Sequence, residues 1–377
     1  MHNNDREQRQ LIVADSQIIN SNIKEVIIKA MKPNTKKTKQ AWIISILLGT
    51  TMLFSFNAWS SASPSAVRMT DSAVSGTQAA EKRPEQQVKV SNIIDTQIHM
   101  GPGGIEETLA AMDAMGIQSV LIDEFWLPGT DYKPHHELAN GSIRPVNPTA
   151  ELAAQLHPER FGWVLRVERN DPEYASIIRM VDDAPVGKGI RIIPGMTLQE
   201  TEAFAQGKYD PILAATEKAG LPLFLYLPDH PELIAKAAQK FPDLRIIVDH
   251  IGLYSNAMRT MFGGAVPARS SEEQLALFDQ VLALSKFPNI ALKWSHASEM
   301  FETPVYPGQA LQPMLRKAIS SFGADRIMWA SDYSVNQRGE NWSEILYGTK
   351  GNTNLSDQER EAIMGGTARK WLDWPAS

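Results

Sequence analysis

Short apolar runs alternate with longer amphipathic stretches along most of this chain, and that alternation limits the possible folds more than any other feature. The eight apolar runs begin at Asn92, Ser119, Phe161, Gly187, Leu221, Leu244, Asn289 and Asp325. Between them lie helical patterns such as 105–116, 231–242 and 271–288, whose apolar residues recur at three- and four-residue steps. Near-continuous apolar strands that alternate with helices are typical of a parallel sheet covered by helices.

The number of these units selects among the parallel folds. Eight strand–helix units in about 285 residues match a (β/α)₈ TIM barrel, whose usual size is ~250 residues. A doubly wound open sheet is the alternative α/β fold, but the GPGG segment at Gly101 lacks the spacing of a dinucleotide-binding loop. We therefore predict a single catalytic barrel domain over residues 91–377.

The amino terminus has the pattern of an export signal. A lysine cluster at 32–39 precedes an apolar run from Ala41 to Phe56, and small residues follow it. This pattern predicts a signal peptide within an amino-terminal segment of residues 1–62, with Met31 as an alternative start, and a periplasmic or secreted protein. An uncleaved membrane anchor is the alternative. Residues 63–90, rich in Ser, Ala, Gln and charge, are expected to be a flexible linker.

Composition narrows the chemistry and the partners. The net charge is -6 without a long basic block, which argues against nucleic acid and leaves a small molecule as the expected partner. The chain has no cysteine, so thiolate nucleophiles, disulfides and cysteine metal sites are excluded. Histidine, carboxylate, lysine and tyrosine side chains remain for catalysis.

Polar side chains end nearly every predicted strand. Active sites of TIM barrels lie at the carboxyl ends of the strands, so these residues are the candidates for function. They are Asp95, Gln97 and His99, then Asp123 and Glu124, Arg166 and Glu168, Arg191, Tyr226, Asp249 and His250, Lys293, Ser295 and His296, and Ser331 and Asp332. The convergence of four of them, His99, Tyr226, His250 and Asp332, on one rim predicts an active site.

Several of the other polar residues have a simpler interpretation. Glu124, Glu168 and His296 are expected to be hydrogen-bonded structural residues or to face water. Asp95 is expected to be a structural hydrogen-bond partner. His135 and His136 lie in a polar segment that we interpret as a loop, which could still carry them over the pocket.

The order of the motifs DTQIH, GIRI, LPLFLY, VDHIG and RIMWASDYS, over Ile93 to Leu372, resembles the amidohydrolase-2 family. The resemblance implies a barrel enzyme. In metal-dependent members two strand-1 His, a strand-5 His and the strand-8 Asp hold a divalent ion, commonly zinc. Here Gln97 stands at the first of these positions and Tyr226 at the strand-5 position. With only His99 and Asp332 left of that set, we expect no metal cofactor, and one divalent ion such as zinc, helped by His250, is the alternative.

The chain is similar in particular to the metal-independent lactonases of that family, typified by 2-pyrone-4,6-dicarboxylate lactonase. Arg191, Tyr226, His250, Lys293 and Asp332 match the pattern of those enzymes. Gln97 departs from it, because those lactonases keep both strand-1 His. Their additional arginines for a second carboxylate are also missing, with Thr197 and Glu299 near the corresponding places. The resemblance therefore implies a lactonase without implying the dicarboxylate pyrone as its substrate.

A hydrolase of a lactone or ester of a small carboxylated molecule, derived from a sugar acid or an aromatic acid, fits these residues. Asp332 is the expected base for water, and His99 and His250 complete the catalytic set as hydrogen-bond donors. Gln97, Arg191, Tyr226 and Lys293 are expected to bind the substrate. The alternatives are lactone isomerisation at a similar donor set, a metal-dependent amidohydrolase or decarboxylase, and a degenerate barrel that binds a ligand without catalysis.

Overall fold

Eight parallel strands form the central sheet of the protein. The computed structural model describes residues 92–100, 103–124, 135–146, 148–263, 267–333 and 340–375. The strands are β1 (Ile93–Ile98), β2 (Ile117–Asp123), β5 (Phe161–Arg166), β6 (Gly187–Ile192), β7 (Leu223–Leu225), β8 (Ile246–Val248), β9 (Ile290–Trp294) and β10 (Ile327–Trp329). They are hydrogen-bonded in that order, and each overlaps one of the eight predicted runs, which confirms the prediction.

The sheet closes where its last strand returns to its first. The backbone N–H of Asp332 donates to the carbonyl of Gln97 at 2.9 Å, and that of His99 donates to the carbonyl of Tyr333 at 3.1 Å. The Thr96 hydroxyl also donates to the Trp329 carbonyl at 2.8 Å. These bonds leave a nearly closed barrel of eight parallel strands, so the predicted (β/α)₈ architecture is confirmed.

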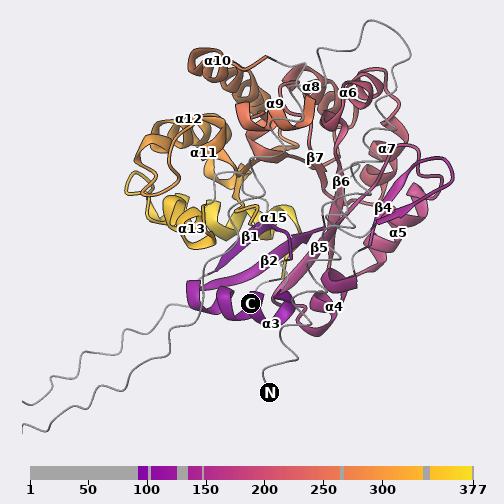
Figure 1. Ribbon diagram of the computed structural model, residues 1–377, viewed down its shortest axis with the longest axis horizontal. Helices are drawn as coiled ribbons and strands as arrows, with labels where there is room; N and C mark the ends of the chain where they lie inside the picture. The colour runs from indigo at the N-terminus through magenta and orange to yellow at the C-terminus, as the bar shows by residue number, and fades with distance from the viewer. Residues whose placement is uncertain are drawn as a thin grey trace, which may run out of the picture. The chain divides into compact units, whose positions relative to one another are not determined.

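Helices surround the strands (Figure 1). They are α3 (Gly104–Met115), α4 (Pro148–Leu156), α5 (Tyr174–Asp183), α6 (Leu198–Ala205), α7 (Asp210–Lys218), α8 (Pro231–Lys240), α9 (Asn256–Gly263), α10 (Ser271–Leu282), α11 (Ala297–Met300), α12 (Gln312–Phe322), α13 (Trp342–Lys350), α14 (Asp357–Glu361) and α15 (Thr367–Trp371). Local sequence sets several of their ends. Ser270 and Glu273 form a capping box at the start of α10, and Gly116 ends α3 with a left-handed φ of 71°.

A two-stranded antiparallel hairpin follows β2 in the described part of the chain. It consists of β3 (His135–Glu137) and β4 (Ile143–Pro145). His135 and His136, which we expected in a loop, lie on β3, where His135 is half-buried and His136 is exposed. The strands have three residues each, too short to produce the alternating apolar pattern that identifies a strand in the sequence.

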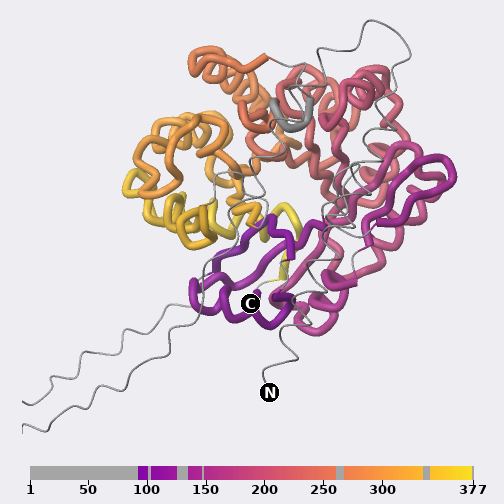
Figure 2. The backbone as a smooth tube through the Cα atoms, in the orientation of Figure 1, coloured from indigo at the N-terminus to yellow at the C-terminus, as the bar shows by residue number. Residues whose placement is uncertain are grey.

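Apolar side chains fill the barrel in a layer below its carboxyl end. Each of seven strands contributes one member, and they are Ile94, Leu121, Val164, Phe224, Ile247, Ala291 and Met328. Trp371, Leu372 and Trp374 of the carboxyl-terminal segment pack against this layer, and that segment lies beside the first strand (Figures 1 and 2). This segment approaches the start of β1 so closely that position 365 must be glycine, because a Cβ on Gly365 would lie 1.9 Å from the Asn92 carbonyl oxygen. A second and larger apolar cluster packs the helices against the outside of the strands.

The predicted signal peptide and linker, residues 1–90, lie outside the described residues. Within the described part of the chain, none of the helices combines the length and the hydrophobicity that a membrane crossing needs.

Candidate active site

A layer of charged side chains lies directly above the apolar layer. Side chains in a strand alternate with a period of two, so residues two positions beyond the apolar layer point into the barrel as well. Six of the seven positions hold polar or charged side chains, and they are Thr96, Asp123, Arg166, Tyr226, Asp249 and Lys293; the seventh holds Ala330. Every one of them is at most 7% exposed. The carboxyl end of the barrel is therefore lined by buried polar groups, as the strand-end residues predict.

Two cations and two carboxylates of this layer neutralise one another. Arg191 donates through Nε to Asp249 Oδ2 at 2.8 Å and forms a short bond with Asp123. The Lys293 ammonium contacts Asp249 on its other side. Burial acts to raise the pKa of Asp249, but Arg191 and Lys293 outweigh it and bring that pKa to about 2. We call Asp123, Arg191, Asp249 and Lys293 the charge layer.

Gln97 connects the charge layer to the rim of the barrel. Its amide oxygen accepts a short bond from the Lys293 ammonium, and its Nε2 donates to Asp123 Oδ2 at 3.3 Å. The same Nε2 lies 3.4 Å from His99 Nε2. Both ends of the Gln97 amide thus have internal partners, so the side chain is held in one orientation.

Three imidazoles converge on the carboxylate of Asp332 at the end of β10. His99 Nε2 lies 2.8 Å from Asp332 Oδ1, and His296 Nε2 makes a short contact with Oδ2. His250 Nε2 lies 3.7 Å from the same Oδ2. All four side chains are buried. We call His99, His250, His296 and Asp332 the imidazole cluster.

Partners at the second ring nitrogen fix two of these imidazoles. His250 Nδ1 lies 2.8 Å from Ser295 Oγ, and His296 Nδ1 lies 3.1 Å from Glu299 Oε1. The rings of His250 and His296 meet edge to face with centroids 4.7 Å apart. Because the Nδ1 atoms are held from outside, the Nε2 atoms of both rings are directed at Asp332.

The backbone at the cluster is in a conformation that non-glycine residues rarely adopt. His250, His296 and Asp332 have φ values of 49°, 53° and 53°. Such left-handed residues cost of order 1–3 kcal/mol each and gather at functional sites. The turns that follow β8, β9 and β10 thus hold these three side chains over the mouth of the barrel.

The close packing of acid and base shifts the pKa values of the cluster. Burial acts to raise the pKa of Asp332, but His296 and His99 lower it well below its usual value. Burial acts to lower the pKa of His296, yet Asp332 and Glu299 raise it to about 10. The pKa of His250 falls well below 6.5, chiefly through burial. An ionised Asp332 paired with a protonated His296, beside a neutral His250, is the resulting charge state near pH 7.

Tyr226 lies next to the cluster from β7. Its ring meets that of His250 edge to face with centroids 5.4 Å apart. Its buried hydroxyl interacts with that of Tyr254, but no hydrogen bond of good geometry is found for it among the described residues. A buried hydroxyl without a well-formed hydrogen bond can donate to a substrate, so this group is a candidate for contact with one.

Asp95 has the structural role that its position suggests. Its carboxylate accepts hydrogen bonds from the backbone N–H of Ser331 at 2.9 Å and from Trp342 Nε1 at 2.8 Å. It thereby ties β1 to the segments that follow β10. Burial raises the pKa of this carboxyl to about 6, against the lowering effect of its hydrogen bonds.

The structure brings together all seven site residues expected from the sequence, in two groups. His99, His250 and Asp332 form the cluster with Tyr226 beside them, whereas Gln97, Arg191 and Lys293 belong to the charge layer or contact it. His296, expected to be a hydrogen-bonded structural residue or to face water, contacts Asp332 and Glu299 through its two ring nitrogens, with a side chain that is 5% exposed. Glu124 is buried, and Glu168 pairs with Arg166 at 2.7 Å, in keeping with a structural role.

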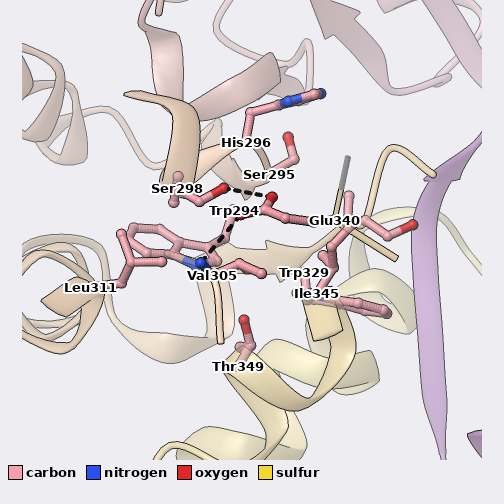
Figure 3. A pocket seen from close by; sticks show the side chains of 13 residues that line it. Trp294, Ser295, His296, Ser298, Val305, Leu311, Trp329, Glu340, Ile345 and Thr349 are labelled. Carbon is pink, nitrogen blue, oxygen red and sulfur yellow. Dashed lines mark hydrogen bonds between the residues drawn. The ribbon is translucent and has the colours of Figure 1, made fainter. Parts of the chain in front are cut away.

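Figure 3 shows a small pocket beside the cluster, with His296 and Ser295 at one side and Trp294, Val305 and Leu311 along it. Its volume is about 20 Å³, room for about one water molecule. Glu340 crosses it and accepts a hydrogen bond from the Ser298 hydroxyl at 3.0 Å. The pocket is too small for a substrate.

Three ligand atoms of the cluster lie close enough together to be considered as ligands of one metal ion. One ligand atom from each of His250, His296 and Asp332 lies within 4.8 Å of the others. Two imidazoles and a carboxylate are donors that zinc accepts, so this site can hold a divalent metal. The family's usual metal positions, by contrast, offer few metal donors in this chain, because Gln97 and Tyr226 stand there beside His99 and Asp332. The Gln97 oxygen also accepts a bond from the Lys293 ammonium.

Comparisons with known proteins give related barrels. A family model described as Amidohydrolase matches residues 131–374. Similar solved structures include an amidohydrolase from Burkholderia multivorans with bound zinc, a probable 2-pyrone-4,6-dicarboxylic acid hydrolase from Acinetobacter baumannii with citric acid bound, and 5-carboxyvanillate decarboxylase from Sphingomonas paucimobilis. Their identities are 16%, 14% and 16% and their TM-scores 0.56, 0.54 and 0.51, and each comparison covers 75% of this chain and 99% of the other. A comparison with curated proteins found no match.

Proposed function

This chain belongs to the amidohydrolase family, and on that premise we propose that it is an exported hydrolase that cleaves a lactone or an ester of a small carboxylated molecule. The family includes hydrolases and decarboxylases, which supports an enzyme of one of these two kinds. Hydrolysis of a lactone or ester is the more specific proposal, and it rests on the cluster at the mouth of the barrel.

The gap between His250 and Asp332 carries this proposal. Their facing atoms, Nε2 and Oδ2, are 3.7 Å apart, too far for a good direct hydrogen bond and suitable for a water that contacts both. A carboxylate and an imidazole beside one water are the groups that general-base hydrolysis needs. We assign Asp332, with His250 beside it, to the activation of this water.

The fixed partners of His99 and Gln97 change the roles expected for them. His99 directs its Nε2 at Asp332, and the Gln97 amide is bound to Lys293 and Asp123. Both side chains therefore position Asp332 and the charge layer. The Tyr226 hydroxyl takes their place as the donor to the oxyanion that develops when water attacks the carbonyl, because it is buried next to His250 and lacks an internal partner of good geometry.

Arg191 is the group we assign to the substrate carboxylate. A guanidinium has five N–H donors, and the bonds to Asp249 and Asp123 use two of them. The remaining donors can bind an anion, although the two carboxylates weaken the attraction by neutralising the charge. The citric acid bound by the similar Acinetobacter baumannii hydrolase is in keeping with a carboxylated ligand at such a barrel. Lys293, which is 1% exposed and bound to Asp249, balances the charge of that carboxylate within the charge layer.

We propose further that the family's usual metal position is not used. Gln97 and Tyr226 replace two of its imidazoles, and the Lys293 ammonium would repel a divalent ion near the Gln97 oxygen. Cleavage of an activated ester or lactone is possible without such an ion, since a base and oxyanion donors suffice in principle. A metal-dependent reaction is the second candidate, favoured by the ligand atoms of His250, His296 and Asp332.

A substrate panel tests the proposal. Purified protein is incubated with lactones and esters of sugar acids and aromatic acids, and acid release is followed at constant pH. Aromatic acids are tested in parallel for release of CO₂. We expect acid release that is about 10²–10⁴-fold slower in Asp332→Asn and a raised KM in Arg191→Ala. Release of CO₂ without ester or lactone cleavage would identify a decarboxylase, and tight binding without turnover would identify a binding protein.

The export part of the proposal has its own test. It is motivated by the lysine cluster at 32–39 and the apolar run Ala41 to Phe56, which together have the pattern of a signal peptide. We expect processed protein in the periplasm or medium, with an amino terminus between Ala58 and Val67. Soluble cytosolic protein that begins at Met1 or Met31 would contradict export, and unprocessed protein in the membrane fraction would support the anchor.

A further inference from the structure

A cavity lies among α9, α10, α11 and α12, and it shares no lining residue with the imidazole cluster or the charge layer. Its volume is about 100 Å³. Three apolar side chains, each buried or half-buried, contribute to its walls, and they are Met300, Phe301 and Met314. Because a cavity of ~150 Å³ holds benzene, this one has room for a molecule of about four to six non-hydrogen atoms.

Arg269 brings a guanidinium to this cavity. The Asn256 side chain holds the Arg269 backbone, because its Nδ2 donates to the Arg269 carbonyl at 3.0 Å and its Oδ1 accepts from the Arg269 N–H at 2.9 Å. Nη1 of Arg269 lies 2.9 Å from Asp229 Oδ1, but among the described residues this nitrogen makes no hydrogen bond of good geometry. Asp229 also accepts a short bond from Arg259. One carboxylate therefore serves two guanidiniums and neutralises the charge of Arg269 only in part.

Two hydrogen-bond acceptors line the same cavity. Gln274 is 7% exposed, and its Nε2 donates to the Tyr254 carbonyl at 2.8 Å. Its Oε1 is buried and has no hydrogen-bond partner among the residues that the structure describes. A buried acceptor of this kind costs free energy unless a donor reaches it. Glu302 adds a carboxylate, whose Oε1 accepts a bond of 2.8 Å from Asn256 Nδ2.

A molecule that satisfies all these groups carries an anion, a cationic donor and an apolar part. We propose that the cavity binds a small α-amino acid with an apolar side chain, such as L-alanine. Its carboxylate pairs with Arg269, whose guanidinium offers donors in the geometry that a carboxylate accepts. Its ammonium donates to Gln274 Oε1 and is attracted by the Glu302 carboxylate. Its side chain packs against Met300, Phe301 and Met314, a contact that removes apolar surface from water.

The methionines of the cavity wall report on binding. Full-length protein labelled with ¹³C at its methionine methyl groups is titrated with L-alanine, and the methyl signals are assigned by single Met→Leu variants. We expect saturable shifts of the Met300 and Met314 signals with a Kd of about 1 mM, an affinity in keeping with so small a ligand. The signal of Met180, which is 49% exposed on α5, should not move. L-lactate, which replaces the ammonium by a hydroxyl, and ethylamine, which lacks the carboxylate, should each bind about 10-fold more weakly.

Two variants test the assignment of the charged groups. Arg269→Gln and Glu302→Gln should each weaken L-alanine binding about 10-fold or more, since each removes a charge that the ligand contacts. Asp229 keeps Arg259 in the first variant, so the fold should persist, and melting curves check this. Arg179→Gln, which alters an exposed arginine of α5, is the matched control and should bind as the wild type.

Three results would overturn the site. They are the absence of a saturable shift in the folded wild-type protein, an unchanged Kd in folded Arg269→Gln, and L-lactate or ethylamine binding as tightly as L-alanine. Binding is measured without a lactone or an ester, so it does not depend on the proposed hydrolysis. That hydrolysis fails separately, if the substrate panel gives no acid release while L-alanine still binds.

Discussion

Removal of the Lys293 ammonium is expected to be among the most damaging single changes in the barrel. Lys293 is 1% exposed, contacts Asp249 and donates to Gln97. Lys293→Met keeps most of the side-chain volume, so the loss comes from the charge rather than from a cavity. Asp249 would keep only Arg191, which it shares with Asp123. Breaking a buried ion pair in this way costs about 3–5 kcal/mol, a large share of the ~5–15 kcal/mol that holds a domain folded.

The Asp249→Asn/Lys293→Met double variant shows whether the cost comes from the unpaired carboxylate. It removes one charge of each sign, and Arg191 can still donate to the oxygen of the introduced amide. We expect the double variant to be more stable than the sum of the single variants by about 1–3 kcal/mol. The free energy of unfolding is measured in urea by tryptophan fluorescence. Lys317→Met is the matched control, because the Lys317–Asp279 pair is half-exposed and such pairs contribute about 0–1 kcal/mol.

Two results would refute this reasoning. One is a Lys293→Met protein as stable as Lys317→Met, which would mean that the ammonium is dispensable beneath the site. The other is strict additivity of Asp249→Asn and Lys293→Met, which would mean that the two charges do not interact. In either case Lys293 would be free for the substrate-binding role expected from the sequence. The effect of Lys293→Met on KM for the substrate would then test that role.

Three further changes test other parts of the account. Asp95 has a pKa of about 6 in the folded protein against about 4 when unfolded, so between these pH values the folded state binds more protons and its stability falls as the pH rises. The stability of the wild type relative to Asp95→Asn should therefore decrease by about 1 kcal/mol between pH 5 and 7.5. A stability difference that stays constant over this range would contradict the raised pKa. Tyr226→Phe should leave the melting temperature unchanged or raise it, while kcat falls about 10²–10³-fold, the usual effect of losing an oxyanion donor. An unchanged kcat would mean that the Tyr226 hydroxyl takes no part in the reaction. Arg191→Lys should raise KM more than it lowers kcat if the guanidinium binds a carboxylate, and the reverse would place Arg191 in the reaction step.

The fold and the strand-end positions of the candidate site could be predicted because they depend on local patterns. Buried parallel strands are apolar over most of their length, so a polar residue at the end of a run such as DHIG or WASDYS stands out. The period of two within a strand then predicts that Asp249 and Lys293 point into the barrel. The hairpin at 135–145 lacked such a pattern, because its strands are three residues long.

The pairing of the polar residues could not be predicted, because it depends on which strands face each other across the barrel. Arg191 meets Asp123 from 68 positions away in the chain, and no periodicity records that contact. The contact of His296 with Asp332 could not be predicted for a related reason. A left-handed turn after β9 directs its ring toward Asp332, whereas the sequence shows only a histidine among polar residues at a strand end. The neighbouring Lys293 and Ser295 were the available signal that this strand end faces the site.

The most direct test of the central claim is the turnover of Asp332→Asn on the best substrate of the lactone and ester panel. Asn keeps the shape and removes the charge on which His99, His250 and His296 converge. Asp325→Asn, which alters an exposed carboxylate paired with Lys370, is the matched control and should behave as the wild type. We predict that kcat of Asp332→Asn falls about 10²–10⁴-fold with little change in KM. A folded Asp332→Asn protein with the kcat of the control would contradict the assignment of the chemistry to this cluster.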